Sequence, residues 1–135
     1  MGMFNVATLR QSNAQNRITA AGASARWDAY NGAKPTNGGA VTGANTLLAR
    51  LISPTVIGTA TNGVTDIDEA GITQTVANHL PGTSTFVDLT NSAGVLVSRF
   101  DVGAGAGNIQ ISGPIVTGQP VTFVLGATIT EGNAT

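Results

Sequence analysis

The sequence contains no cysteine, little charge and no long hydrophobic run. Without cysteine, neither disulfide bonds nor a thiolate metal site can stabilise the fold. Only 10% of the 135 residues are charged and the formal net charge is −1, so there is no basic stripe to neutralise phosphates. No segment approaches the length of a membrane span, and residues 1–9 lack the charged start and apolar run of a signal peptide. We therefore expect synthesis in the cytoplasm, with neither nucleic acid nor membrane as a partner.

Side chains that carry chemistry are scarce. The one histidine, His79, stands at an expected strand end or loop, where a lone histidine is more often a surface or hydrogen-bonding residue than a base. Asp28 and Asp88 lie in expected strands far apart in the sequence, and nothing in the sequence pairs them. We expect no enzymatic activity and assign neither aspartate a role.

Three carboxylates, Asp66, Asp68 and Glu69, stand close together, and oxygen ligands of this kind can bind Ca²⁺. The segment lacks the turn glycine and the distant glutamate of the calcium helix–loop–helix motif. A solvated strand edge that discourages aggregation accounts for these residues better. We therefore expect no metal ion and no cofactor.

Short β-branched and aromatic segments separated by turn residues predict an all-β protein. Eighteen glycines and frequent turn signals favour a β-sandwich or jelly-roll-like single domain over an α/β fold. The clearest element is a hairpin in which residues 85–90 and 95–102 flank turn residues 91–94. The other expected strands comprise residues 24–30, 47–52, 56–61, 64–68, 72–77, 108–112 and 121–130.

Two segments have a different pattern. We expect residues 1–22 to form an N-terminal arm or short helix, and residues 23–135 to form the β-sandwich domain. Apolar spacing permits a helix that Gly22 ends, but several Asn, Ser and Thr residues leave an extended arm as the alternative. Residues 31–46, rich in Gly, Asn, Thr and Ala, predict a long surface loop of the kind that contacts partners.

Strand alternation places Trp27 and Tyr30 on opposite faces. We expect Trp27 to face the core with Ala25 and Ala29, and Tyr30 to contact another chain. The predicted core anchors are Trp27, Leu51, Phe86, Val97, Phe100 and Phe123.

Hydrophobic residues make up 41% of a chain with few charges. Solubility usually depends on a mixed charged surface, so part of this surface is expected to be covered by a partner, unless Thr, Asn, Gln and Ser supply enough polarity. The apolar residues that precede the first expected strand would be exposed to water without such a partner. The candidate interface residues are Phe4, Val6, Leu9, Arg10, Arg17 and Tyr30.

Five short motifs follow one another between residues 25 and 125. In chain order they are Tyr30, Gly32 and Pro35; Leu47, Leu48, Ala49 and Leu51; Asn91, Ser92 and Gly94; Val102 and Gly103; and Val121, Thr122 and Phe123. Their order resembles that in a group of small virion proteins of tailed bacteriophages, the capsid decoration or cement proteins. The chain departs from this group at Phe86 and Val87, where a Trp-Phe pair is usual, and in residues 1–20.

This resemblance implies a structural virion protein of the capsid exterior, made in the host cytoplasm. Such β-sandwich proteins bind the outer surface of the major capsid protein lattice, usually as a homodimer or homotrimer, and stabilise the head. Two alternatives stay open: a tail or fibre component, and a carbohydrate-binding or adhesion module that would use Trp27 and Tyr30. Hydrolase activity around His79 and the carboxylates is the least favoured.

Overall fold

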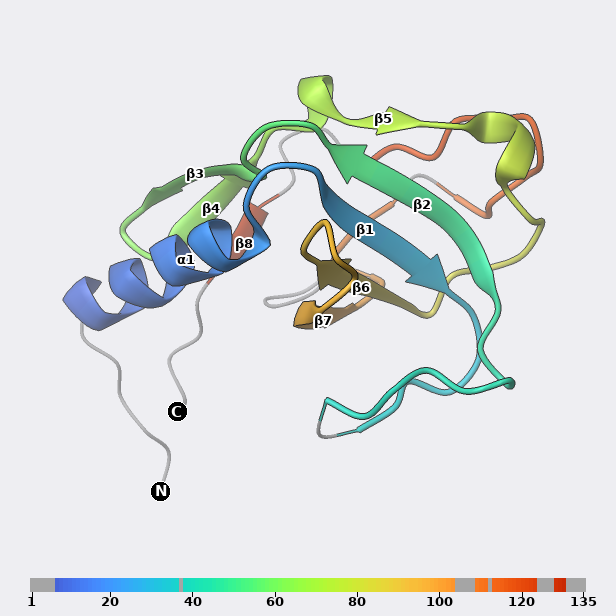
Figure 1. Ribbon diagram of the computed structural model, residues 1–135, viewed down its shortest axis with the longest axis horizontal. Helices are drawn as coiled ribbons and strands as arrows, with labels where there is room; N and C mark the ends of the chain where they lie inside the picture. Colours follow the sequence, from blue (N-terminus) through green and yellow to red (C-terminus); the bar gives the residue numbers. More distant parts are fainter. Residues whose placement is uncertain (1–6, 37, 104–108, 112, 124–127, 131–135) are drawn as a thin grey trace.

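The computed structural model describes residues 7–36, 38–103, 109–111, 113–123 and 128–130 of the chain (Figure 1). Within these ranges the strands are β1 Ala25–Tyr30, β2 Leu47–Ser53, β3 Gly58–Thr61, β4 Val64–Ile67, β5 Thr73–Gln74, β6 Phe86–Thr90, β7 Leu96–Asp101 and β8 Thr128–Thr130. The helices are α1 Ala7–Ala21 and two 3₁₀ turns, η1 Glu69–Gly71 and η2 Val76–Asn78.

All strand pairs are antiparallel and form two sheets among the described residues. The larger sheet has the order β5-β2-β1-β6-β7, and the smaller has the order β3-β4-β8. The helix α1 lies beside the smaller sheet, and the loop after β1 extends from the opposite end of the larger sheet (Figure 1). The described part of the chain is therefore mainly β with one α-helix, as the sequence predicts in outline.

Alternation along the strands gives the larger sheet a core face and an outer face. In β1, Ala25, Trp27 and Ala29 belong to the hydrophobic core, whereas Asp28 and Tyr30 lie on the outer face. This confirms the predicted separation of the tryptophan from the tyrosine.

The predicted hairpin is confirmed, with β6 paired to β7. The Asn91 side chain fixes its turn, because Oδ1 accepts hydrogen bonds from the backbone N–H groups of Ala93 at 2.9 Å and Val95 at 3.0 Å. An Asx turn of this kind is encoded by the turn residue itself and fixes the register of the two strands.

Trp27 is the centre of the core and is 1% exposed. Its ring meets Phe123 edge to face, with centroids 5.1 Å apart, and its Nε1–H donates to Ser53 Oγ at 2.9 Å. Leu51 and Phe100 are buried in the same cluster, as predicted. Val97 is partly buried against that cluster and so anchors it less than expected.

The described part of the N-terminal segment is an α-helix, Ala7–Ala21. Of the two predicted alternatives, a helix and an extended arm, the helix is therefore found. Gly22 ends it in the left-handed conformation, φ 63°, and its N–H donates to the Ile18 carbonyl at 3.0 Å. Ile18 and Ala21 join the main core, so helix and sheets share one set of apolar contacts. No helix in the described ranges is long and apolar enough to cross a bilayer.

A two-residue turn joins β3 to β4, and the sequence reasoning missed it. Asn62 and Gly63 both have positive φ, 53° and 80°, as a type I′ turn requires. Gln11 of α1 holds this hairpin, because its Nε2 donates to the Ala60 carbonyl and its Oε1 accepts from Gly63 N–H, both at 3.0 Å. The Asn-Gly pair is a hairpin signal that was available in the sequence.

Three predicted strands differ from the structure. Residues 72–77 form only the short strand β5, followed by η2. In the segment 108–112, Ile109 and Ile111 make isolated bridges, while residues 108 and 112 lie outside the described ranges. Within 121–130, Phe123 makes one bridge, residues 124–127 lie outside the description, and β8 covers the end.

The first residue of β3, Gly58, has no room for a side chain. A Cβ there would overlap the carbonyl oxygen of Asp66 on the paired strand β4. We predict that Gly58→Ala lowers the free energy of unfolding by about 1–3 kcal/mol, because two paired strands must move apart. Urea denaturation followed by tryptophan fluorescence measures the loss.

The matched control is Gly43→Ala, at a glycine with open space around the added Cβ and no positive φ. This control should change stability by less than about 0.5 kcal/mol. Equal effects of the two substitutions would show that the close approach at Gly58 does not limit the fold.

Candidate functional site

A row of four charged side chains crosses the outer face of the larger sheet. Arg50 on β2, Asp28 on β1, Asp88 on β6 and Arg99 on β7 occupy directly opposed positions in successive strand pairs. Two aspartates side by side in the centre of this row would repel each other and destabilise the sheet. The arginines at the two ends of the row supply the compensating charges.

Each arginine binds its aspartate through two parallel hydrogen bonds. Arg50 donates from Nε and Nη2 to the two carboxylate oxygens of Asp28 at 2.7 and 3.0 Å. Arg99 donates in the same way to Asp88 at 2.6 and 2.9 Å. The Arg99–Asp88 pair is the more buried, with side chains 9% and 7% exposed, whereas the Arg50 side chain is 41% exposed.

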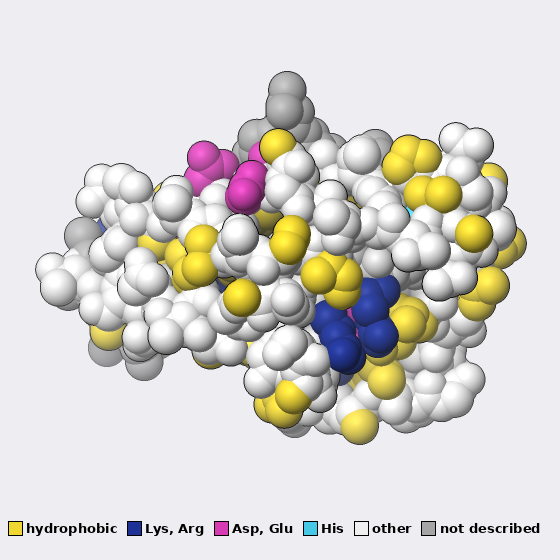
Figure 2. All heavy atoms as spheres, turned by 45° about the horizontal axis from the view of Figure 1, so that its top comes forward, with side chains coloured by type: hydrophobic (Ala, Val, Ile, Leu, Met, Phe, Trp, Pro, Cys, Tyr) yellow, Lys and Arg dark blue, Asp and Glu magenta, His cyan; other side chains and the backbone are white. Residues whose placement is uncertain are grey.

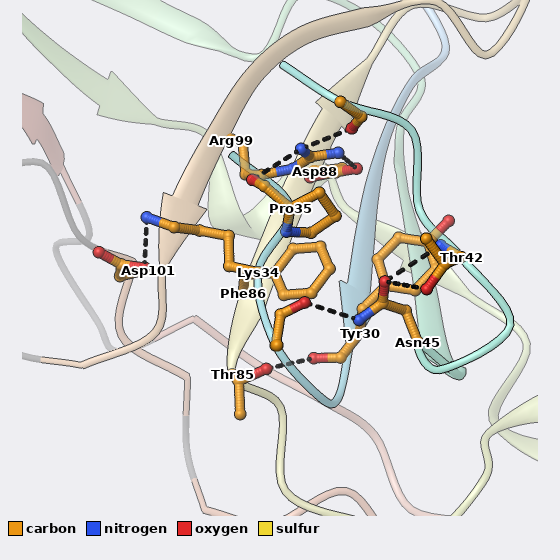
Figure 3. Close-up of polar contacts among 12 residues, drawn as sticks. Tyr30, Lys34, Pro35, Thr42, Asn45, Thr85, Phe86, Asp88, Arg99 and Asp101 are labelled. Atoms are coloured by element: carbon orange, nitrogen blue, oxygen red, sulfur yellow. Dashed lines mark hydrogen bonds and ion pairs between the residues drawn. The ribbon is translucent and has the colours of Figure 1, made fainter. Parts of the chain in front are cut away.

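Arg99 also fastens the cover loop, which we define as residues 31–46, described except for 37. Its Nη1 donates to the backbone carbonyls of Pro35 at 3.2 Å and Gly39 at 2.8 Å (Figure 3). With the bonds to Asp88, this one guanidinium joins two strands and the loop. The cover loop is thus held over the outer sheet face by a buried charge-assisted network.

The ends of the cover loop are fixed by uncharged groups. Asn45 Nδ2 donates to the carbonyls of Asn31 and Ala33 at 3.0 and 2.9 Å, and the Thr85 hydroxyl donates to the Gly32 carbonyl at 2.6 Å. Gly32 has φ 80°, and a Cβ there would lie 2.6 Å from the Ala44 carbonyl oxygen. The predicted surface loop is therefore a structured cover and not a free segment over its described residues.

The stacked rings of Phe86 and Tyr30 lie on the sheet beneath the cover loop. Their rings stack at 5.3 Å with an interplanar angle of 16°, and the Arg99 guanidinium lies 5.4 Å from the Phe86 centroid (Figure 3). Phe86 is fully buried, as predicted, but on the outer sheet face and not in the Trp27 core. The cause is strand alternation, since Val87 and Leu89 take the core face of β6.

Between the cover loop and the hairpin turn at Gly94 lies a cleft of about 440 Å³. We call it the charged cleft, and its charged lining consists of Arg26, Asp28, Arg50, Asp88 and Arg99. In the space-filling view, basic side chains gather in one hollow of the visible face, and most of the surrounding surface is uncharged (Figure 2). Three guanidinium groups against two carboxylates leave the charged cleft with a net charge of +1.

The surroundings shift the ionisation of three groups in the charged cleft. Hydrogen bonding to Asp28 raises the pKa of Arg50, and hydrogen bonding to Asp88 raises that of Arg99, although burial acts in the opposite direction. Burial raises the pKa of Tyr30, and the charges of Asp28 and Asp88 raise it further. The arginines therefore stay charged, and the tyrosine keeps its proton to higher pH than usual.

The raised pKa of Tyr30 makes stability depend on alkaline pH. The unfolded chain loses the tyrosine proton near pH ~10, whereas the folded chain retains it longer. The stabilising contribution is therefore complete below pH ~10 and is lost as pH rises through the folded-state pKa. Because the chain has one tyrosine, tyrosinate absorbance during alkaline titration reports on Tyr30 alone.

We predict a higher titration midpoint for the folded than for the urea-unfolded protein. The Tyr30→Phe variant should remove the corresponding part of the stability loss above pH ~10. Identical midpoints in the two states would contradict the burial of Tyr30 against Phe86.

The six predicted interface residues fall in separate places. Tyr30 lines the charged cleft, and Leu9 is exposed on α1. Arg17 instead joins α1 to β7, because its Nε donates to Ser98 Oγ at 2.9 Å and its guanidinium lies 5.9 Å from the Phe100 centroid. Arg10 is half-buried on α1, and Phe4 and Val6 lie outside the described residues.

Of the two roles expected for His79, a surface residue or a hydrogen-bonding residue, the structure shows the second. The side chain is 2% exposed, and its Nδ1–H donates to the Gln119 carbonyl at 2.9 Å. Its Nε2 is buried and has no hydrogen-bond partner in the part of the chain that the structure describes. The lining of the adjoining cavity of about 340 Å³ contains no carboxylate among the described residues, so no base with an orienting acid is assembled there.

In the acidic segment, Asp68 has a structural role. Asp68 accepts a hydrogen bond from Gly71 N–H at 3.3 Å and so caps η1. Asp66 is exposed as predicted, but β4 is the central strand of its sheet and not an edge. Among residues 7–36, 38–103, 109–111, 113–123 and 128–130, no three His, Cys, Asp or Glu side chains are grouped so that they could hold a metal ion.

The two aromatic residues considered for carbohydrate binding are not available as a pair. Trp27 is buried in the core, and Tyr30 stacks on Phe86 beneath the cover loop. A sugar platform needs exposed aromatic faces. The described surface therefore gives the carbohydrate alternative no specific support.

Comparison with protein-family models, with curated proteins and with solved structures finds no match to this chain.

Proposed function

We propose that the chain is a structural virion protein, a capsid decoration or cement protein that binds the outer surface of the major capsid lattice and stabilises the head. The observation that carries this proposal is the charged cleft with its cover loop. The buried Arg99–Asp88 ion pair and the hydrogen bonds from Arg99 to the cover loop hold this face in place, so a partner can bind it at little cost in conformational entropy. Its groups are suited to recognition and not to bond breaking.

The resemblance of the five ordered motifs adds the kind of assembly. Two of these motifs stand at the charged cleft: Tyr30, Gly32 and Pro35 lead into the cover loop, and Asn91, Ser92 and Gly94 form the hairpin turn. The other three of the five motifs belong to the sheets and the core. On this proposal the two sheets form a β-sandwich of jelly-roll-like type. The two motifs at the charged cleft fix the shape of the outer sheet face.

The proposed partners are the major capsid protein and further copies of this chain, as a homodimer or homotrimer. Low charge supports contact with protein, because polar uncharged surface is cheaper to desolvate than charged surface. Nucleic acid is not a proposed partner, since a net charge of +1 in the charged cleft is too small for phosphate backbone binding. The proposed location is the capsid exterior of the virion.

Sedimentation with empty capsid shells of the encoding virus tests the proposal. The expected result is saturation at a fixed ratio of protein to capsid subunit, together with a discrete dimer or trimer mass by light scattering before mixing. A protein that stays in the supernatant at all ratios would overturn the proposal. Binding to purified tails with no binding to shells would instead support the tail or fibre role.

A further inference from the structure

Arg26 differs from the other two arginines of the charged cleft. It lies on β1 and lines the cleft, and its Nη1 is 3.5 Å from the position that a Cβ on Gly94 would take. Among the described residues, Arg26 makes neither a hydrogen bond through its guanidinium nor an ion pair, whereas Arg50 and Arg99 each bind an aspartate. A half-buried guanidinium in this position has unused N–H donors.

The aspartates of the cleft are already engaged. Asp28 accepts two hydrogen bonds from Arg50, and Asp88 accepts two from Arg99. The positive charge of Arg26 is therefore the unbalanced charge of the cleft. Because the whole chain carries −1, the rest of the molecule sums to −2, and the excess positive charge of the cleft favours an anion there.

A carboxylate fits this site better than a phosphate. A guanidinium binds a planar carboxylate through two parallel hydrogen bonds. The two nearby aspartates would repel a doubly charged phosphate more strongly than a singly charged carboxylate. Apolar neighbours, Val41 and Leu96, can pack against the methylene groups of an acidic side chain.

We propose that Arg26 binds an aspartate or glutamate side chain of a partner polypeptide that enters between the cover loop and the hairpin turn at Gly94. This inference rests on the proposed function for the identity of the partner, the capsid subunit. Arg50 and Arg99 shape the cleft, and Arg26 recognises the incoming carboxylate. Val95, 61% exposed, lies in the chain between the cleft residues Gly94 and Leu96 and is available for apolar contact with the same partner.

The first test compares Arg26→Gln with wild-type protein in sedimentation with shells. Loss of a buried charge-assisted pair should weaken binding by about 30-fold or more, and wild-type binding should fall more steeply with salt. Arg26→Lys keeps the charge but not the planar fork, so its affinity should be intermediate. Thermal melting checks that each variant folds, which is expected because, within the described part of the chain, no hydrogen bond or ion pair depends on this guanidinium.

The matched control is Lys34→Gln. Lys34 carries the same charge but lies outside the cleft lining, in an exposed ion pair with Asp101 at 2.7 Å (Figure 3). This variant should change shell binding by less than about threefold. Equal losses from Lys34→Gln and Arg26→Gln would attribute the effect to net charge and overturn the assignment of Arg26.

The second test separates this inference from the proposed function. N-acetylglutamate amide is titrated into isotope-labelled protein, and the Arg26 Nε–H resonance is followed by nuclear magnetic resonance, with inorganic phosphate as the comparison. A saturable shift with the glutamate derivative supports the inference even if wild-type protein ignores shells. A shift with phosphate alone, or with neither probe, overturns it even if wild-type protein binds shells.

Discussion

Arg99→Met should lower the free energy of unfolding by about 3–5 kcal/mol. The substitution leaves the buried Asp88 carboxylate without its partner, directly opposite Asp28, and it removes both bonds to the cover loop. Urea denaturation followed by Trp27 fluorescence measures the change, because this chain has one tryptophan and it lies on the same sheet.

Two further variants show whether the unpaired carboxylate causes the loss. The double variant Asp88→Leu with Arg99→Met removes both charges, so it should recover part of the stability. Arg50→Met should cost less than Arg99→Met, because the Arg50 side chain is 41% exposed and water can replace part of its contact. If Arg99→Met cost no more than Arg50→Met, the buried network would not be what secures the cover loop.

Trp27→Ala should also lower the free energy of unfolding by about 3–5 kcal/mol. The substitution opens a cavity against Phe123 and Phe100 and leaves the Ser53 hydroxyl, which is buried, without the indole N–H. Circular dichroism in urea measures the loss, since the variant has no tryptophan fluorescence.

Trp27→Phe serves as a graded comparison, because it keeps most of the apolar ring and removes the hydrogen bond. Its cost should be smaller than that of Trp27→Ala. Val95→Ala, at a side chain 61% exposed, should change stability by less than about 0.5 kcal/mol. A Trp27→Ala variant with near wild-type stability would show that the core does not depend on this ring.

The sequence predicts the strands best where local chemistry decides them. In the β6–β7 hairpin, turn residues stand between two β-branched segments, and the observed strands agree with the expected ones to within a residue or two. In β1, alternation alone separates Trp27 from Tyr30. These features depend on neighbours in the chain, so they are visible without knowledge of the fold.

The charged row could not be predicted, because it depends on strand neighbours and register. Asp28 and Asp88 meet only because β1 pairs with β6 in one particular register. A shift of one residue in this pairing would turn one of the two side chains to the core face. The available signal was that four apolar strands each contain a central charge, two acidic and two basic, which indicates complementary positions on one sheet face.

His79 shows a second limit of sequence reasoning. Its burial follows from contacts with distant segments, since Gln119 accepts from its ring and the Thr117 hydroxyl donates to its backbone carbonyl at 2.6 Å. Neither partner is close to it in the sequence. A polar residue near a loop is usually exposed, and tertiary packing overrode that expectation here.

The most direct test of the central claim is electron cryomicroscopy of empty capsid shells of the encoding virus after incubation with saturating protein. The proposed function predicts additional density at symmetric positions on the shell exterior, with the outer face of the larger sheet turned toward the capsid subunits. Shells without additional density, under conditions in which the protein is folded and in excess, would contradict it.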